Sequence, residues 1–320
     1  MDLSQISVFC FTASYAVALS LETVSLVRRF GWHRLVLLAF AVAGVFAHGA
    51  YLVLQSRGAV VAEGGAPLSS PADWCLVASL SMACLYLAAS FWWPKWATGL
   101  FLLPVVLGLI AAAGMASPTP LSAESASIVW RRTHGVLLLL ATVTVSIGFL
   151  AGLMYLIQSW RLKHKMPPSA TFRLPSLEWL ERVNARSLGV SALLVGGGFV
   201  SGLVLARLKA PDQPAAMWGD PVVLSLAGMF VWLLAAESFR AVYPAARRGR
   251  KVAYLTTASF VFLVITIASM TLTAGRVHSG PMGRLEPAKG LSEPVASAAG
   301  AEPITAPAAD AAGSLPTPSR

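Results

Sequence analysis

The sequence predicts an all-α integral membrane protein with about eight transmembrane helices and both termini on the outer, periplasmic side. The composition, the spacing of the apolar segments and the distribution of basic residues support this fold class. Hydrophobic residues make up 56% of the 320 residues and charged residues 12%, with a mean hydropathy of +0.69. Soluble domains carry about 25% charged residues, so the composition places the chain in the membrane class.

Apolar segments of membrane-spanning length recur along the chain. A bilayer core of about 30 Å needs about 20 apolar residues per helix, and the runs that meet this length are 6–27, 35–55, 74–92, 97–115, 135–158, 188–206, 222–239 and 252–274. Tryptophans lie near the ends of several runs, as in the aromatic belts of membrane proteins. The first run lacks a preceding basic segment and an A-x-A cleavage site, so we expect a retained helix rather than a signal peptide.

The segments between and within these runs carry local signals. Residues 174–186 place leucines near one face and predict a short helix on the membrane surface, with Ser176 as its N-cap. Pairs of glycines at 148 and 152 and at 198 and 202 have the G-x-x-x-G spacing that is typical of close helix packing. Asp220 and Pro221 are expected to begin the seventh helix.

The basic residues set the predicted orientation. One set of loops holds 15 of the 24 lysines and arginines, and the other set holds 6. The positive-inside rule places the richer set in the cytoplasm, so we expect a multi-pass protein of the inner (plasma) membrane. The positive charge is then a topology signal, and no nucleic-acid partner is expected. Residues 1–278 form the predicted transmembrane domain, and the Ala/Pro-rich residues 279–320 are a predicted disordered outer tail.

Cysteine chemistry is not indicated. Cys10, Cys75 and Cys84 lie in or beside apolar segments, and the chain has no C-x-x-C-H haem attachment motif. The protein is therefore not itself a c-type cytochrome.

Histidines on the predicted outer side are candidate haem ligands. His134 opens the fifth apolar run and His278 follows the eighth, and neutral imidazole is a usual axial ligand of haem iron. Arg131 and Arg132 precede His134, and a guanidinium matches the carboxylates of haem propionates. The alternative for these residues is contact with lipid headgroups at the interface.

His48 is the histidine placed inside a predicted helix, about 10 Å from its outer end. An ionisable residue at that depth is costly and suggests a function. Two interpretations stay open: a ligand on a path for haem, or a hydrogen bond to a neighbouring helix.

The order of residues resembles the cytochrome c assembly family of haem-handling membrane proteins, the CcsA and CcmC type, including the shorter HemX-like branch. The resemblance spans about residues 5–278 and rests on a histidine that opens a helix ending in GLMYLIQSWRLKHK, then LPSLEWLERVNARSLGVSALLVGGGFVSGLV, then WGDP before a helix leading to RRGRKVAYL, and a final histidine. In that family two outer histidines flank a tryptophan-rich loop that holds haem. The resemblance implies that His134 and His278 are the iron ligands, with Trp218 and Asp220 in the loop.

The resemblance implies haem b as cofactor and a role in delivering haem for c-type cytochrome biogenesis. The implied partners are apocytochrome c or another cytochrome c assembly membrane protein, besides the lipid bilayer. The family's loop has several tryptophans, whereas this loop has Trp218 alone, which favours a HemX-like member. The alternative function is an accessory or regulatory membrane protein of haem metabolism without a stable haem site. A small-solute transporter is disfavoured, because the two halves lack matching Gly/Pro-broken helices. Whether the protein is an enzyme stays open.

Overall fold

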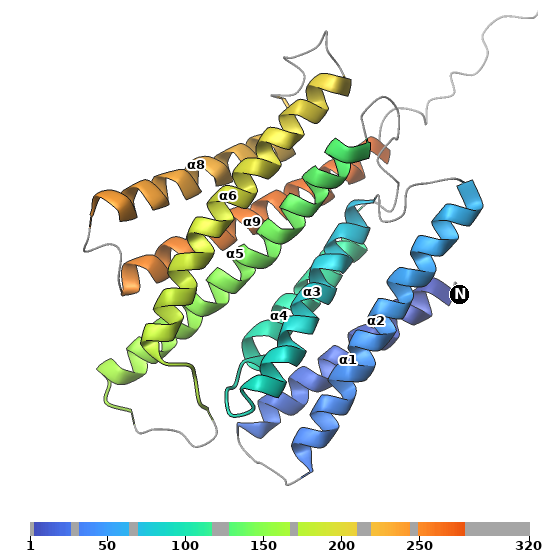
Figure 1. Ribbon diagram of the computed structural model, residues 1–320. Helices are drawn as coiled ribbons and strands as arrows, with labels where there is room; N and C mark the ends of the chain where they lie inside the picture. The colour runs from blue at the N-terminus through green and yellow to red at the C-terminus, as the bar shows by residue number, and fades with distance from the viewer. Residues whose placement is uncertain are drawn as a thin grey trace, which may run out of the picture. The chain divides into compact units, whose positions relative to one another are not determined.

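The structure is a computed structural model that describes residues 3–26, 32–63, 70–116, 128–166, 172–209, 219–243 and 249–278. These residues form eight helices and no strand (Figure 1), which confirms the all-α prediction. The helices are α1 (Leu3–Ser25), α2 (His33–Glu63), α3 (Pro71–Trp92), α4 (Gly99–Met115), α5 (Ile128–Lys163), α6 (Leu177–Lys209), α8 (Pro221–Val242) and α9 (Arg250–His278). Seven of them are long and apolar enough to cross a membrane.

The remaining helix, α4, is short and apolar, with 17 residues. At 1.5 Å per residue it is about 26 Å long, slightly less than the bilayer core of about 30 Å. Pro104 lies inside it and removes one backbone donor from the helix. The helix has no charged residue, so its composition suits a membrane span if it stands close to the bilayer normal.

Several helices extend beyond their apolar runs. The sequence places the start of the fifth helix at residue 135, whereas α5 begins at Ile128. The predicted surface helix at 174–186 is wrong as a separate element, because α6 runs without interruption from Leu177 to Lys209. Ser176 does cap this helix, since its hydroxyl accepts a hydrogen bond from Trp179 N at 3.3 Å. These differences arise because a helix can continue past the bilayer core through polar turns. Such turns carry no apolar pattern, so the sequence does not mark them as part of the helix.

The helices pack in two groups. Helices α1 to α4 form most of one apolar core, which Leu150 of α5 joins, while α5, α6, α8 and α9 share a second core. Within the second group, α5 packs against both α6 and α9, and the three ribbons run alongside one another in Figure 1.

Small residues allow α5 to approach α6 and α9 closely. A Cβ on Gly148 would lie 3.1 Å from Cβ of Ser187 on α6, and one on Gly152 would lie 2.8 Å from Oγ1 of Thr256 on α9. The side-chain amide nitrogen of Asn184 on α6 donates to Gly148 O at 3.1 Å and to Thr256 Oγ1 at 2.6 Å, so that one buried side chain joins all three helices. The packing role predicted for the glycine pair at 148 and 152 is confirmed.

The predicted orientation can be tested with reporter fusions. A reporter that is active only outside the cytoplasm should be active when fused after residue 278 and silent when fused within 165–172, because α6, α8 and α9 lie between these points. Fusions within 64–69 and within 117–127 should both be active, since α3 and α4 would cross the membrane twice. The reverse pattern at the first two sites would overturn the orientation, and a silent fusion within 117–127 would show that α4 does not cross.

Candidate functional site

The candidate site lies where α5 begins and α9 ends, at the end of the bundle where α3 also begins (Figure 1). We call this the His134 end. The sequence predicts that it faces outward. Because α5 begins at Ile128, His134 lies inside the helix rather than at its opening. Arg131 and His134 are therefore separated by three helical positions and lie on neighbouring parts of one helix face.

The His134 ring is held by α6. Nδ1 of His134 lies 2.9 Å from the carbonyl oxygen of Gly198 and 3.3 Å from Oγ of Ser201. A carbonyl oxygen only accepts hydrogen bonds, so Nδ1 must carry the proton and donate it. In the neutral ring, Nε2 then keeps its lone pair. Histidines that bind metals commonly have this arrangement, with the second ring nitrogen donating to a carbonyl or a carboxylate.

Glycines on α6 make room for this ring. A Cβ on Gly202 would lie 2.8 Å from Cε1 and 3.2 Å from Nδ1 of His134. One on Gly198 would lie 2.5 Å from Cδ2 of Leu138. The second G-x-x-x-G pair therefore allows close packing, as the sequence predicts, and it also determines where the imidazole lies.

A tryptophan from α3 covers the neighbouring turn of α5. The Trp74 ring lies directly against Gly135, where an added Cβ would lie 2.7 Å from Cη2. The start of α3 is fixed by a capping box between Ser70 and Asp73, and Gln55 Nε2 donates to Asp73 Oδ1 at 2.9 Å. Through these contacts α2 and α3 position an indole against Gly135, the residue that follows His134.

The two arginines before His134 differ in their surroundings. Arg131 is partly buried, and its Nη1 atom is buried without a hydrogen-bond partner in the described part of the chain. Arg132 is exposed. A buried guanidinium nitrogen without an acceptor is costly, so the Arg131 position favours a bound anion.

The end of α9 lies at nearly the same level as His134. Phe149 of α5 stacks on Phe260 of α9 with ring centroids 4.0 Å apart, and the two helices are antiparallel. Counting equal steps from this pair places His134 level with about residue 275, and His278 lies one turn beyond at about 1.5 Å per residue. The side chain of His278 lies outside the described residues.

The loop before α8 is described only in part. Trp218 lies outside the described residues. Asp220 is the N-cap of α8, and its Oδ1 accepts a hydrogen bond from Val222 N at 2.8 Å. Asp220 and Pro221 thus begin the helix as the sequence predicts. A contact between Asp220 and a cofactor stays a prediction.

His48 lies in a separate place, between α1 and α2. Its ring is fully buried and stacks on Phe11 at a centroid distance of 4.1 Å. The Tyr15 hydroxyl is 3.4 Å from Nδ1, which is a long hydrogen bond. These contacts provide the interhelical bond that the sequence leaves as one interpretation. His48 does not meet His134 through any of them, and its role on a haem path stays a prediction.

Four residues of this site are not signalled as site residues by the sequence: Trp74, Gly198, Ser201 and Gly202. Each meets α5 through tertiary packing between helices far apart in the chain. The G-x-x-x-G spacing is the one sequence signal for these contacts. It indicates that another helix can approach α6 closely, but it does not identify the residue that does so.

Comparison with known proteins finds a distant relative of the chain. A protein of Azospirillum brasilense described as "Uncharacterized 28.8 kDa protein in nifR3-like 5'region" is 26% identical to the chain over 196 residues, which cover 60% of this chain and 67% of that protein. No family model matches the chain. No solved structure matches it.

Proposed function

We propose that this protein binds haem b at the outer face of the inner membrane and delivers it for c-type cytochrome assembly. His134 and His278 would be the iron ligands, and apocytochrome c or another assembly membrane protein would be the partner. The observation that carries the proposal is the hydrogen bond from His134 Nδ1 to Gly198 O. This hydrogen bond keeps the proton on Nδ1 and leaves the lone pair on Nε2, the ring nitrogen that would coordinate the iron.

The other residues at the His134 end suit the chemistry of haem. The cofactor combines an apolar ring with two anionic propionates. Arg131 offers a buried guanidinium nitrogen without a partner among the described residues, and Trp74 offers an indole against Gly135, the residue that follows His134. When bound, haem would supply the vinyl groups that form the thioether bonds of a c-type cytochrome. The residues of this chain would hold the imidazole in one tautomer and the propionates at the rim.

A charge-reversal series tests this proposal. We expect Arg131→Glu to lower the haem-to-protein ratio about tenfold or more, because a charge-assisted hydrogen bond contributes about 1.5–3 kcal/mol. Arg131→Lys should keep part of the haem, since an ammonium lacks the planar fork of the guanidinium. The ratio is measured on protein extracted in detergent after growth with added haem precursor.

Arg132→Glu is the matched control, because Arg132 is adjacent in the sequence but exposed. It should lower the ratio less than Arg131→Glu does. If the arginines only contact lipid headgroups, all variants will have the ratio of the wild type, and the assignment of Arg131 to a propionate fails.

A further inference from the structure

Three tryptophans cluster at the end of the bundle opposite the His134 end, where α3 ends and α4 begins (Figure 1). Trp93 and Trp96 lie in the connection between these helices, and their rings stack with centroids 4.9 Å apart. The Trp179 ring of α6 packs against both, with its centroid 6.1 Å from that of Trp93 and 5.3 Å from that of Trp96. We call these residues the tryptophan cluster. Trp93 is 39% exposed, so the cluster reaches the surface of the bundle.

A backbone hydrogen bond joins the two chain segments that carry this cluster. Ala97 N donates to Arg173 O at 2.9 Å, so the segment before α6 lies against the α3–α4 connection. Trp96 N donates to Trp93 O at 3.0 Å and closes a turn that contains Lys95. Lys95 and Arg173 are therefore held on neighbouring stretches of backbone, although they lie far apart in the chain.

Lys95 and Arg173 are exposed cations without an acidic partner. Neither forms an ion pair or a side-chain hydrogen bond within the part of the chain that the structure describes. The carboxylate next to Trp179, that of Glu178, is paired with Arg182 at 3.3 Å. Arg173 contributes a backbone oxygen to the packing, which leaves its guanidinium available. Two unpaired cations on neighbouring segments favour an anion that both can reach.

The position of these cations favours a phospholipid phosphate among possible anions. Tryptophans of membrane proteins concentrate at the bilayer interface, and the headgroup phosphates lie at the same level. The guanidinium of Arg173 presents paired donors that match a phosphate, and the ammonium of Lys95 adds a point charge. A zwitterionic headgroup brings a cation of its own, which both residues repel, so the site favours a lipid with a net negative charge.

We propose that Lys95, Arg173 and the tryptophan cluster form a binding site for the headgroup of an anionic phospholipid. The two cations bind the phosphate, and the exposed part of the indole cluster lies at the boundary between headgroup and acyl chains. Because the site joins the α3–α4 connection to the start of α6, a bound lipid stabilises the contact between the two groups of helices. The proposal does not depend on haem binding at His134.

Removal of the two charges tests the proposal. Lys95→Gln and Arg173→Gln are combined in one protein, which keeps the hydrogen bond from Ala97 N because its acceptor is a backbone atom. The matched control combines Lys163→Gln with Lys165→Gln and removes the same charge from exposed residues where α5 ends. Native mass spectrometry of protein titrated with phosphatidylglycerol measures the affinity for the first bound lipid. We expect the first variant to bind about tenfold more weakly than the wild type, and the control to match the wild type.

The control separates a defined site from general attraction to a cationic end of the bundle. Equal weakening in the two double variants would show that anionic lipid responds to overall charge, and the proposed site would be wrong. Unchanged affinity in the variant of Lys95 and Arg173 would equally overturn the proposal.

A second measurement uses the wild-type protein alone and does not depend on a variant folding. In a neutral detergent, phosphatidylglycerol should raise the midpoint of thermal unfolding, as a ligand of the native state does. Phosphatidylcholine with the same acyl chains should raise it less, and inorganic phosphate should leave it unchanged. Equal shifts for the two lipids would show that headgroup charge is not recognised, and an equal shift with inorganic phosphate would show that a soluble anion is the ligand. Either result would contradict the proposal.

Discussion

Gly202→Ala should lower the haem affinity of the protein about 10- to 100-fold while α6 stays helical. The added Cβ would lie 2.8 Å from Cε1 of His134, closer than side chains pack, so the ring must move away from Gly198 O. Loss of a partner that orients a metal-binding histidine typically costs 10- to 100-fold in affinity, and we expect a fall of about that size in haem affinity. Alanine is favoured over glycine inside a helix by about 1 kcal/mol, which offsets part of the cost of about 1–3 kcal/mol that such close packing carries.

Gly197→Ala is the control for this substitution. It changes the same helix by the same methyl group, but its Cβ would meet Leu137 Cδ1 at 3.4 Å, an ordinary contact. Haem titration of both variants, followed by absorbance, measures the affinity, and circular dichroism checks the helical content. Equal affinity for the wild type and Gly202→Ala would show that the packing of His134 on α6 has no role in haem binding.

The sequence predicts the membrane-spanning helices well, because each must present about 20 apolar residues to lipid whatever its neighbours are. It predicts their ends less well. Residues 128–134 read IVWRRTH and carry two arginines and a histidine, so polarity suggests a loop. In the structure these residues continue α5. Outside the bilayer core a helix needs only satisfied backbone groups and no breaker, and no proline or glycine interrupts this segment.

The sequence predicts the central residues of the site but not the residues that contact them. His134 and Arg131 stand out because histidine and arginine are unexpected beside an apolar run on the predicted outer side. The partners of the ring come from α6, 64 and 67 residues later in the chain. Which residue of α5 faces Gly198 and Gly202 depends on the axial register of two long helices, and a pattern of small residues does not fix that register.

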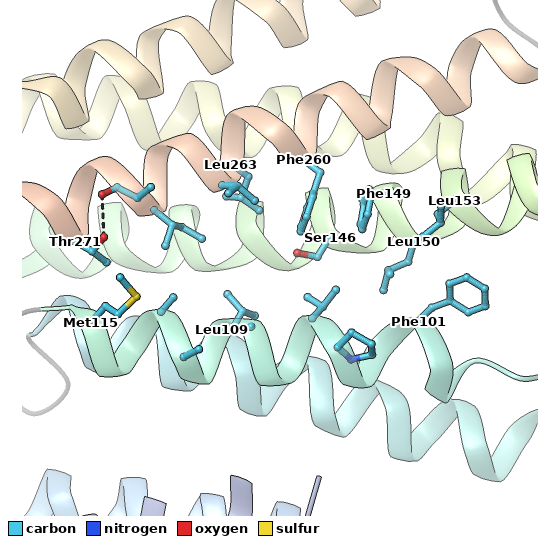
Figure 2. Close-up of a pocket in the computed structure, with 18 of the residues that line it drawn as sticks. Phe101, Leu109, Met115, Ser146, Phe149, Leu150, Leu153, Phe260, Leu263 and Thr271 are labelled. Atoms are coloured by element: carbon cyan, nitrogen blue, oxygen red, sulfur yellow. Dashed lines mark hydrogen bonds between the residues drawn. The ribbon is translucent and has the colours of Figure 1, made fainter. Parts of the chain in front are cut away.

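An apolar groove between α4 and helices α5 and α9 (Figure 2) shows the same limit. Gly108 and Phe260 are ordinary residues of apolar helices when read in sequence. They line one groove because α4 packs mainly with α1 and α3, while α9 packs mainly with α5 and α8. How closely α4 approaches α5 and α9 depends on all of these helices, and no single helix reveals it.

The second large effect is expected for His134→Gly, which removes the imidazole and leaves a space for an exogenous one. We expect the haem content to fall to about a tenth or less of the wild-type value, because the loss of a ligand should cost at least as much as the loss of its orienting partner. Added imidazole should restore part of the haem content by binding the vacant iron position.

His164→Gly is the matched control. Nδ1 of His164 also lies 2.9 Å from a backbone carbonyl, that of Trp160, but His164 is about 45 Å away along α5.

Haem binding at His134 is tested by the absorbance spectrum of the purified protein, supplied with haem and separated by size-exclusion chromatography. We expect a Soret band that elutes with the wild-type and His164→Gly proteins, is lost in His134→Gly, and returns in part when imidazole is added. A wild-type protein that elutes without a Soret band, or a His134→Gly protein that keeps the full band, would contradict the assignment of His134 as a haem ligand.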